Sequence, residues 1–306
     1  MQVSDRKTKC SDYRFTFLLY YFAYFLQIAA KSIFYLINVF ELKNLAFSSL
    51  FLLFILLLQG TFSQAQAIRL KVMAYNVHHC NPPSRTDGFI DMPAIARVIN
   101  DADPDLVALQ EIDVHTERSG KEINQAQELG RLTGMHHYFA KAIDYQGGEY
   151  GVAVLSKYPI LEAVAYPLPL PSGVTGEPRV VAAVKVEIAK GTSIWFASTH
   201  LDLKEDTRVF QSERIIERFS SLKEPFILAG DFNAVPTSRV ISLLDGNFTR
   251  TCLDDCEPTS PNINPRRTID YIMYTQPRRV RTLRMEVIQE TYASDHLPIA
   301  AVLSID

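Results

Sequence analysis

The residues best suited to chemistry lie in Phe226–Pro236, which reads FILAGDFNAVP. The apolar run Phe226–Ala229 predicts a short buried strand that stops at Gly230, where glycine lets the backbone turn. Asp231 and Asn233 follow, with one residue between them. A carboxylate and a carboxamide at the end of a buried strand suit a hydrolytic site at a sheet edge. They also suit an ordinary Asx-rich turn, so the interpretation depends on partners elsewhere.

Polar side chains also lie at the ends of other predicted strands. They are Asn76 after KVMAY, Glu111 after LVALQ, His200 after WFAST, Asp270 near the start of TIDYIMY, and Asp295 and His296 before LPIAAVL. Side chains at strand ends can converge on one cleft although they are far apart in the sequence. So many placements of this kind in one chain are hard to explain by packing alone.

Three of these residues offer oxygen ligands. Glu111, Asp295 and Asn76 form an oxygen-rich set, which suits a hard cation better than zinc. The cation expected is Mg²⁺, with Mn²⁺ or Ca²⁺ as alternatives.

The other members of the set move protons or bind anions. A carboxylate such as Asp270 can fix the tautomer of His296 and raise its basicity. His200 offers a second imidazole for the opposite side of a phosphate. A metal, two imidazoles and the Asp231/Asn233 pair together are the equipment for in-line attack of water on a phosphoester.

Alternating strands and helices are expected to position these residues. Predicted strands cover residues 70–75, 106–110, 137–140, 150–155, 180–188, 193–199, 226–229, 269–274, 280–287 and 299–303. Predicted helices cover residues 92–100, 122–133, 206–222 and 238–244, with Asp91 as the N-cap of the first. Antiparallel hairpins mixed with helical crossovers cover both sheet faces, which favours a layered α/β sandwich. No repeat or Gly/Ser linker interrupts residues 68–306, which predicts one domain.

The first 67 residues have a different composition. Leu45–Leu58 is about the length of a signal-peptide core, Lys43 precedes it, and small residues at cleavage spacing follow in Ser63–Ala67. We therefore expect a secretory signal peptide and a secreted or periplasmic domain. Phe15–Phe40 is a second apolar segment, either a membrane anchor or part of an over-long reading frame. Membrane contact is expected only through residues 1–67.

Charge and cysteine content limit the partners. Residues 68–306 hold 25 Lys and Arg against 31 Asp and Glu, a net charge of −6. Proteins that grip extended nucleic acid usually present a basic surface, so this partner is not favoured. We expect a monomer with a phosphoester substrate. Cys252 and Cys256 either form a small disulfide loop or stay as free thiols, and they are a weak zinc signal.

Eight segments together resemble the endonuclease/exonuclease/phosphatase superfamily, the deoxyribonuclease I-like fold, which includes abasic-site endonuclease and neutral sphingomyelinase. They are MAYNVHH, LVALQEID, YGVAVLSKYPI, EPRVVAAVKV, STHLD, LAGDFNAVP, TIDYIMY and SDHLPIAAVL, in the family's order. They span residues 70–303, and their joint occurrence is specific although each alone is weak. The resemblance implies a four-layer α/β sandwich, with two mixed, mainly antiparallel sheets packed face to face and helices outside.

The resemblance also implies a role for each site residue. Glu111 is the principal metal ligand, with Asn76 and Asp295 around the metal; Asp231 orients or deprotonates the attacking water; Asn233 binds the phosphate; Asp270 pairs with His296; and His200 stabilises phosphoryl oxygens or helps the leaving group. Glu149 resembles the acid that supports this last histidine, and Arg179 resembles an arginine near the phosphate. Arg118, in a loop after Glu111, is a further candidate for substrate contact. Which histidine is the base stays open.

These features predict a secreted, metal-dependent phosphoester hydrolase, either a phosphodiesterase or a phosphatase. The substrate alternatives are DNA or RNA, a phospholipid as in sphingomyelinase, and a small phosphorylated metabolite. A protein of another class, a non-catalytic binding protein on the same fold, is also conceivable because fold does not fix function. The complete set of site residues argues against it.

Overall fold

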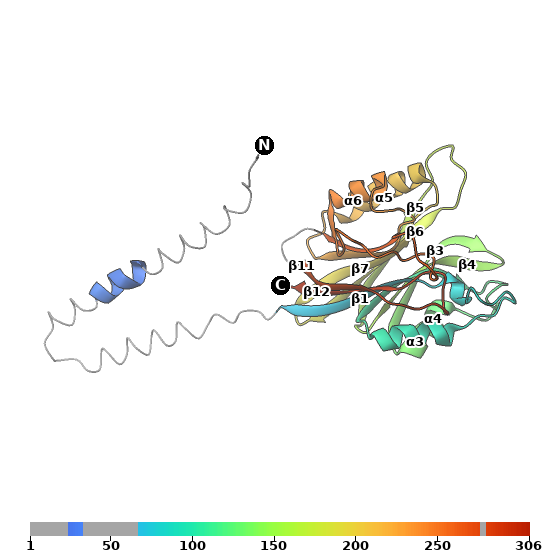
Figure 1. Ribbon diagram of the computed structural model, residues 1–306, viewed down its shortest axis with the longest axis horizontal. Coiled ribbons are helices and arrows are strands. Elements are labelled where there is room, and N and C mark those ends of the chain that lie inside the picture. The colour runs from blue at the N-terminus through green and yellow to red at the C-terminus, as the bar shows by residue number, and fades with distance from the viewer. Residues whose placement is uncertain (1–23, 33–66, 276–279) are drawn as a thin grey trace. The chain divides into compact units, whose positions relative to one another are not determined.

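The computed structural model describes residues 24–32, 67–275 and 280–306 (Figure 1). The chain divides into two units, Met1–Gln64 and Ala65–Asp306. In the first unit, residues 24–32 form a helix. The expected signal-peptide core, residues 45–58, lies outside the described residues, so the signal peptide and the anchor remain predictions. Within the described ranges, no helix has the length and apolar character needed to cross a membrane.

The second unit contains two six-stranded sheets. The first has the order β11 (Val280–Val287), β12 (Ile299–Ile305), β1 (Ile68–Asn76), β2 (Leu106–Val114), β4 (Gly148–Ser156) and β3 (His136–Tyr145). The second has the order β5 (Ile160–Leu168), β6 (Arg179–Ala189), β7 (Thr192–His200), β8 (Phe226–Asp231), β10 (Asp270–Thr275) and β9 (Phe248–Arg250). In each sheet one parallel pair, β1 with β2 or β7 with β8, lies between antiparallel pairs.

Helical segments lie in the connections between strands of both sheets, including those between the parallel strands. They are η1 (His78–Cys80), α3 (Met92–Ala102), α4 (Gln125–Thr133), α5 (Glu205–Phe219) and α6 (Arg239–Asp245). Asp91 caps α3 as predicted, because its carboxylate accepts a hydrogen bond from the Ala94 amide at 3.0 Å. Gly134 ends α4 in the left-handed conformation that favours glycine.

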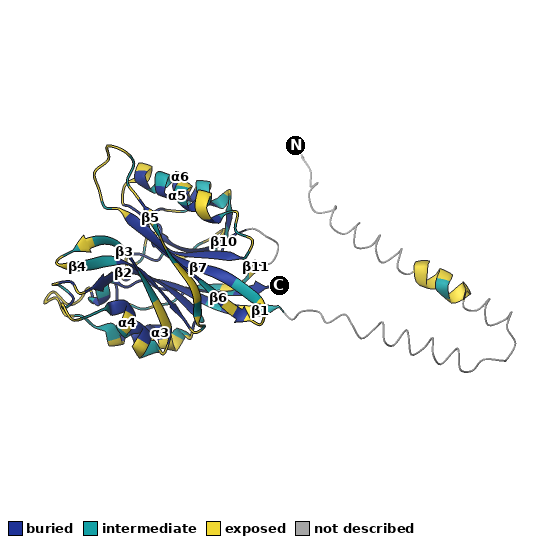
Figure 2. Cartoon of the chain, turned by 180° about the vertical axis from the view of Figure 1, so that it is seen from behind, coloured by how far each residue is buried: buried dark blue, intermediate teal, exposed yellow. Residues whose placement is uncertain are grey.

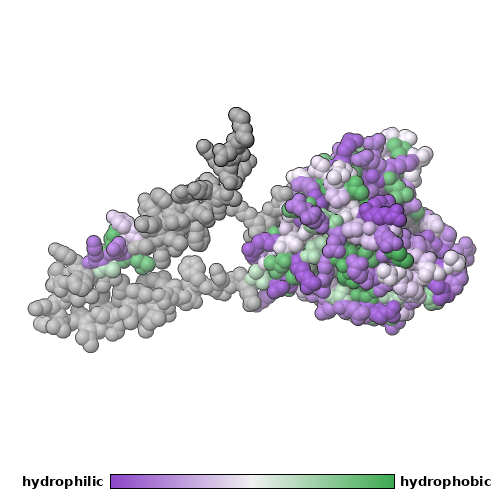
Figure 3. All heavy atoms as spheres, viewed as in Figure 1, coloured by the Kyte–Doolittle hydropathy of each residue, from purple (hydrophilic) through white to green (hydrophobic). Residues whose placement is uncertain are grey.

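The sheets and helices make four layers (Figures 1 and 2). One apolar cluster fills the space between the sheets, with Val72 and Ala108 from the first sheet and Phe196 and Ile227 from the second. Two further clusters lie under the helices, one joining α3 and α4 to the first sheet and the other joining α5 and α6 to the second. This confirms the predicted four-layer α/β sandwich. Hydrophilic side chains predominate on the face seen in Figure 3.

The sequence prediction was incomplete at the sheet edges. It omitted β5 and β9, and it gave residues 137–140 where β3 is longer. All three strands lie at an edge of a sheet, where one side of the strand has no neighbour. Such strands bury fewer side chains, so their sequences lack the apolar run that marks a central strand. Pro167, which cannot donate a ladder hydrogen bond, is tolerated in β5 for the same reason.

Candidate active site

The strand ends that carry polar residues meet because of strand direction. β1 and β2 run in parallel, and so do β7 and β8, so each pair ends on one side of its sheet. The antiparallel strands β12 and β10 begin on that same side. In the second sheet His200 and Asp270 are the direct neighbours of Asp231 in the strand register. The predicted convergence of these residues is therefore built into the topology.

Two local backbone features place the carboxylates at this edge. Glu111 has a φ of 60° and is the extra residue of a bulge in β2, where the register with β4 shifts between Gln110 and Ile112. The sequence predicts that the strand stops at Gly230. The structure instead places Gly230 inside β8. A Cβ there would come within 2.0 Å of the Thr199 carbonyl oxygen, so the close approach of β7 requires glycine.

Asp231 is the centre of the contacts. Its Oδ2 lies 3.1 Å from Asn76 Nδ2, 3.4 Å from His200 Nε2 and 3.8 Å from His296 Nε2. Its Oδ1 accepts a hydrogen bond from the backbone amide of Asn233 at 2.8 Å. Burial, together with the nearby charge of Asp270, raises the pKa of Asp231 to about 7. A carboxylate of this kind can accept a proton near neutral pH.

His296 and Asp270 form the predicted pair. The Nδ1 atom of His296 lies 2.9 Å from Asp270 Oδ2 and 3.2 Å from its Oδ1. Burial works against a charged imidazole, but the Asp270 carboxylate outweighs it and raises the pKa of His296 to about 10, with help from Asp231 and Asp295. The ring is therefore cationic at neutral pH, and its Nε2 faces Asp231.

His200 has the opposite electrostatic setting. Burial lowers its pKa well below the ordinary value, and the charges of Arg179 and His296 add to this shift. Its Nδ1 has no hydrogen-bond partner among the described residues. Glu149, expected to support this ring, instead lies 3.3 Å from Lys141 Nζ and is half-exposed. The structure does not join Glu149 to His200 by a hydrogen bond.

Two carboxylates on the first sheet fit a divalent cation. Burial raises the pKa of Glu111, and the like charge of Asp295 adds to the increase, so the two carboxylates repel one another. Within residues 67–275 and 280–306, neither carboxylate pairs with Lys or Arg. A cation such as Mg²⁺ would remove this repulsion and would satisfy oxygens that lack a positive partner. Glu111 and Asp295 are the residues that would hold it.

Asn76 lies in the same region and links two of the carboxylates. Its Nδ2 donates to Glu111 Oε1 at 3.2 Å as well as to Asp231, whereas its Oδ1 accepts from the His78 amide at 3.1 Å. The amide oxygen is thus engaged by the backbone, and the amide nitrogen joins the two carboxylates. In this arrangement Asn76 orients Glu111 and Asp231.

A second cluster has the spacing of metal ligands. Asp231, Asp270 and His296 offer ligand atoms that all lie within 4.8 Å of one another. The hydrogen bond between His296 and Asp270 already engages the His296 Nδ1 atom and Asp270 Oδ2. Hard cations also prefer oxygen to imidazole nitrogen. The Glu111 side therefore fits Mg²⁺ better than this cluster.

The two predicted substrate-binding arginines have different surroundings. Arg179 is buried at the start of β6, lies 3.1 Å from Glu177 and borders the same small space as Tyr150 and His200. Its Nε atom has no hydrogen-bond partner among the described residues. Arg118 donates to both carboxylate oxygens of Asp113, at 2.7 and 3.0 Å. Its guanidinium is committed to this ion pair, and the structure does not bring it to the other site residues.

Sequence reasoning missed two hydroxyl groups that donate hydrogen bonds to site residues. Ser294 Oγ donates to the Asn76 carbonyl at 2.6 Å, and Thr259 Oγ1 donates to Asp270 Oδ2 at 2.5 Å. The position of Ser294 next to Asp295 was a usable signal. Thr259 lies in a loop without a pattern, and no feature of the sequence marks it.

Comparisons with known proteins agree with this geometry. The model of the endonuclease/exonuclease/phosphatase family matches residues 73–296. An endonuclease/exonuclease/phosphatase from Beutenbergia cavernae is 22% identical, with a TM-score of 0.66 over 78% of this chain and 72% of that chain. Mannosyl-6-phosphatase Bt3783 from Bacteroides thetaiotaomicron is 20% identical, with a TM-score of 0.63 over 76% of this chain and 99% of that chain. The human Nocturnin catalytic domain is 21% identical, with a TM-score of 0.58 over 78% of this chain and 95% of that chain.

At these identities the structural likeness shows a shared fold. No curated protein matches the sequence of this chain. The family model, however, covers most of the second unit and includes every strand end that carries a polar site residue. The chain therefore belongs to the endonuclease/exonuclease/phosphatase family and is a phosphoester-hydrolysing enzyme.

Proposed function

We propose that this enzyme hydrolyses its phosphoester by in-line attack of water on phosphorus, with Mg²⁺ held by Glu111 and Asp295. The observation that carries the proposal is the convergence on Asp231, whose Oδ2 lies within 3.8 Å of donor atoms from Asn76, His200 and His296. A buried carboxylate held in this way can orient a water molecule and accept its proton. When bound, the cation would neutralise charge on the phosphoryl oxygens.

The remaining side chains divide the anion-binding tasks. His296 is cationic at neutral pH because its pKa is raised, so its Nε2 donates to a phosphoryl oxygen. His200 is neutral because its pKa is lowered, and it assists the leaving oxygen by hydrogen bonding. Arg179 lies near His200 and adds positive charge to the phosphate site.

For the substrate we favour a small phosphorylated metabolite. The net charge of −6 for residues 68–306 does not suit extended nucleic acid. The fold is also similar to that of a mannosyl-6-phosphatase, whose name indicates a small phosphomonoester substrate. A nuclease and a phospholipid hydrolase are the alternatives.

A substrate panel tests the proposal. The full chain is assayed with p-nitrophenyl phosphate, bis-p-nitrophenyl phosphate, sugar phosphates, oligonucleotides and phospholipid vesicles, each with Mg²⁺, Mn²⁺, Ca²⁺ or EDTA. We expect turnover of a small phosphoester with Mg²⁺ and none with EDTA. Absence of metal-dependent turnover on every substrate would contradict the proposal. Preferential cleavage of oligonucleotides or vesicles would replace the metabolite with the corresponding alternative.

We also propose that the enzyme acts as a secreted or periplasmic monomer. The support is the apolar segment at residues 45–58, followed by small residues, and the Cys252–Cys256 disulfide, a bond typical of oxidising compartments. N-terminal sequencing of the mature protein tests this. A start near residue 66 or 68 supports the signal peptide, whereas retention of Leu45–Leu58 contradicts it.

A further inference from the structure

Thr259 makes a direct contact with the carboxylate that orients His296. Its Oγ1 donates to Asp270 Oδ2 at 2.5 Å and accepts a hydrogen bond from the Ile269 amide at 3.3 Å. The same carboxylate oxygen is the one that lies 2.9 Å from His296 Nδ1. Thr259 is fully buried, so water does not replace its hydroxyl. The three side chains form a continuous buried chain of hydrogen bonds.

The backbone of Thr259 is hydrogen-bonded to the segments that carry the two members of the pair. Its carbonyl oxygen accepts from the Leu297 amide at 2.7 Å, next to His296. Its own amide donates to the Arg267 carbonyl at 2.8 Å, a short distance before Asp270. One residue therefore fixes the separation between the segment before β12 and the segment before β10.

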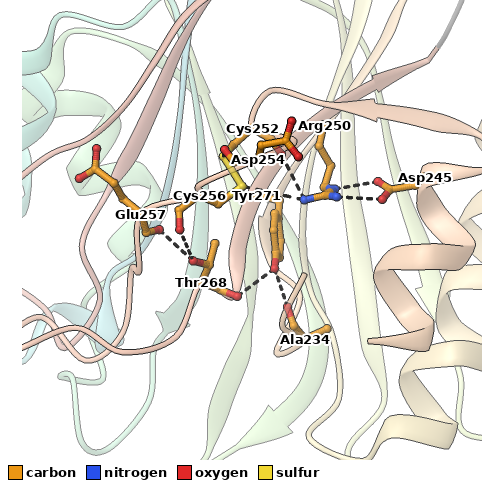
Figure 4. The surroundings of a disulfide bond; sticks show 9 residues. All are labelled: Ala234, Asp245, Arg250, Cys252, Asp254, Cys256, Glu257, Thr268 and Tyr271. Atoms are coloured by element: carbon orange, nitrogen blue, oxygen red, sulfur yellow. Dashed lines mark hydrogen bonds and ion pairs between the residues drawn. A yellow bond between two sulfur atoms is a disulfide. The ribbon is translucent and has the colours of Figure 1, made fainter. Parts of the chain in front are cut away.

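The disulfide loop that precedes Thr259 is bonded to the same region (Figure 4). Thr268 Oγ1 lies 3.0 Å from the Cys256 carbonyl oxygen and 2.9 Å from that of Glu257. Tyr271 OH lies 2.8 Å from the carbonyl oxygens of both Thr268 and Ala234. These contacts surround Asp270 on both sides along the chain. The loop therefore delivers Thr259 to Asp270 in a defined position.

We infer that Thr259 is a positioning residue, whose hydroxyl holds the Asp270 carboxylate in the orientation that directs the His296 ring toward Asp231. Without the hydroxyl, Asp270 Oδ2 loses a donor that is buried with it, and the carboxylate is free to turn away from the ring. The Nε2 atom of His296 then no longer faces the phosphate in one direction. This role rests on the proposed hydrolytic function.

The first test compares three single variants of the full chain. Thr259→Val keeps the shape and removes the hydroxyl, whereas Thr259→Ser keeps the hydroxyl. Thr275→Val is the matched control, because Thr275 is also buried in β10 and its Oγ1 accepts from the Phe226 amide at 3.2 Å, at the opposite end from Asp270. We expect Thr259→Val to lower kcat about 10-fold with little change in KM, and the other two variants to retain kcat. Equal kcat in Thr259→Val and the wild type would overturn the inference.

The second test separates positioning from a general loss of structure. If the hydroxyl acts only through Asp270, adding Thr259→Val to Asp270→Asn should lower kcat no further. A double variant whose fold-loss in kcat equals the product of the two single losses would overturn the inference. A kcat loss in Thr259→Ser equal to that in Thr259→Val would also overturn it. If Thr259→Val does not fold, Thr259→Cys, which replaces the hydroxyl by a weak thiol donor of similar size, takes its place in both comparisons. A wild type without any phosphoesterase activity would instead contradict the proposed function, so the two failures are distinguishable.

Discussion

The two sheets follow one plan but bring different chemistry to the site. Each has six strands with a central parallel pair that ends at the same edge. At that edge the first sheet presents the amide of Asn76 and the carboxylate of Glu111, and the second presents His200, Asp231 and Asp270. The first set suits a hard cation, and the second suits proton transfer and anion binding. The same topology therefore supports two separate tasks.

The comparison also shows where the two halves are joined. Asn76 of the first sheet donates to Asp231 of the second, and His296, just before β12 of the first sheet, pairs with Asp270 of the second. Behind the site, Gln110 donates to Ser198 across the two sheets at 2.9 Å. The geometry of the site thus depends on how the sheets pack, and variants on each side should fail in different ways.

The largest effect is expected on the second sheet. Asp231→Asn removes the carboxylate that we propose accepts the proton of the attacking water, so kcat should fall roughly 1,000-fold. The variant should still fold, because a neutral amide replaces a buried carboxylate. Added Mg²⁺ should not restore the rate. Asp206→Asn is the control, since the Asp206 side chain is 94% exposed and its substitution should leave kcat unchanged. Steady-state assays measure both, and a near-normal rate in Asp231→Asn would exclude it as the base.

The corresponding change on the first sheet should alter metal dependence. Glu111→Gln removes the charge of the proposed principal ligand, so the Mg²⁺ concentration for half-maximal rate should rise about 10-fold or more. Unlike Asp231→Asn, this variant should recover part of its rate at high Mg²⁺. Glu117→Gln, at an exposed position, is the control. A Mg²⁺ titration of the reaction rate that gives the wild-type midpoint for Glu111→Gln would break the proposed division between the sheets.

The pair that joins the sheets should make stability depend on pH. The pKa of His296 is raised from 6.5 to about 10, so its contribution to stability is fully present below pH 6.5 and is lost as the pH rises through 10. Between pH 7 and 10 in EDTA, this residue alone should lower the free energy of unfolding by up to about 1.4 kcal/mol per pH unit. Urea titrations at a series of pH values measure this. Asp270→Asn should flatten the dependence, and an equally steep decline in that variant would contradict the assignment.

The smallest effect is expected behind the site. Ser198→Ala leaves the buried Gln110 amide without its acceptor and the Leu109 carbonyl without its donor, so it should destabilise the fold by about 1–3 kcal/mol. The exposed Ser221→Ala should change stability by less than about 0.5 kcal/mol. Chemical denaturation compares them. Equal stability of the two variants would show that this contact does not hold the sheets together.

The sequence was sufficient for the central strands and insufficient for the edges. Central strands such as β2 and β8 are buried on both faces, so they appear as apolar runs that end at a polar residue. The edge strands β3, β5 and β9 lack such runs because their burial is incomplete or their length is short. The prediction that Gly230 ends its strand was also wrong. Glycine is needed there because Thr199 of a neighbouring strand lies close to it, and the sequence does not show this distance.

Residue types predicted the candidates for the site but not their contacts. Asp270 and His296 were paired correctly because each lies at a strand end. Arg118 was expected at the substrate, but a nearby carboxylate, Asp113, holds it, and its residue type alone does not say which anion it binds. Thr259 reaches Asp270 only through the closure of a loop. The sequence also left the Cys252–Cys256 bond open, and the structure forms it.

Hydrolysis in ¹⁸O-labelled water is the most direct test of whether the reaction breaks the P–O bond, as attack at phosphorus requires, or the C–O bond. The full chain is incubated with its best phosphoester substrate and Mg²⁺, and the products are analysed by mass spectrometry. The arrangement around Asp231 predicts that the label enters the phosphate product and that EDTA abolishes turnover. Label in the alcohol product, or unchanged turnover in EDTA, would contradict the account.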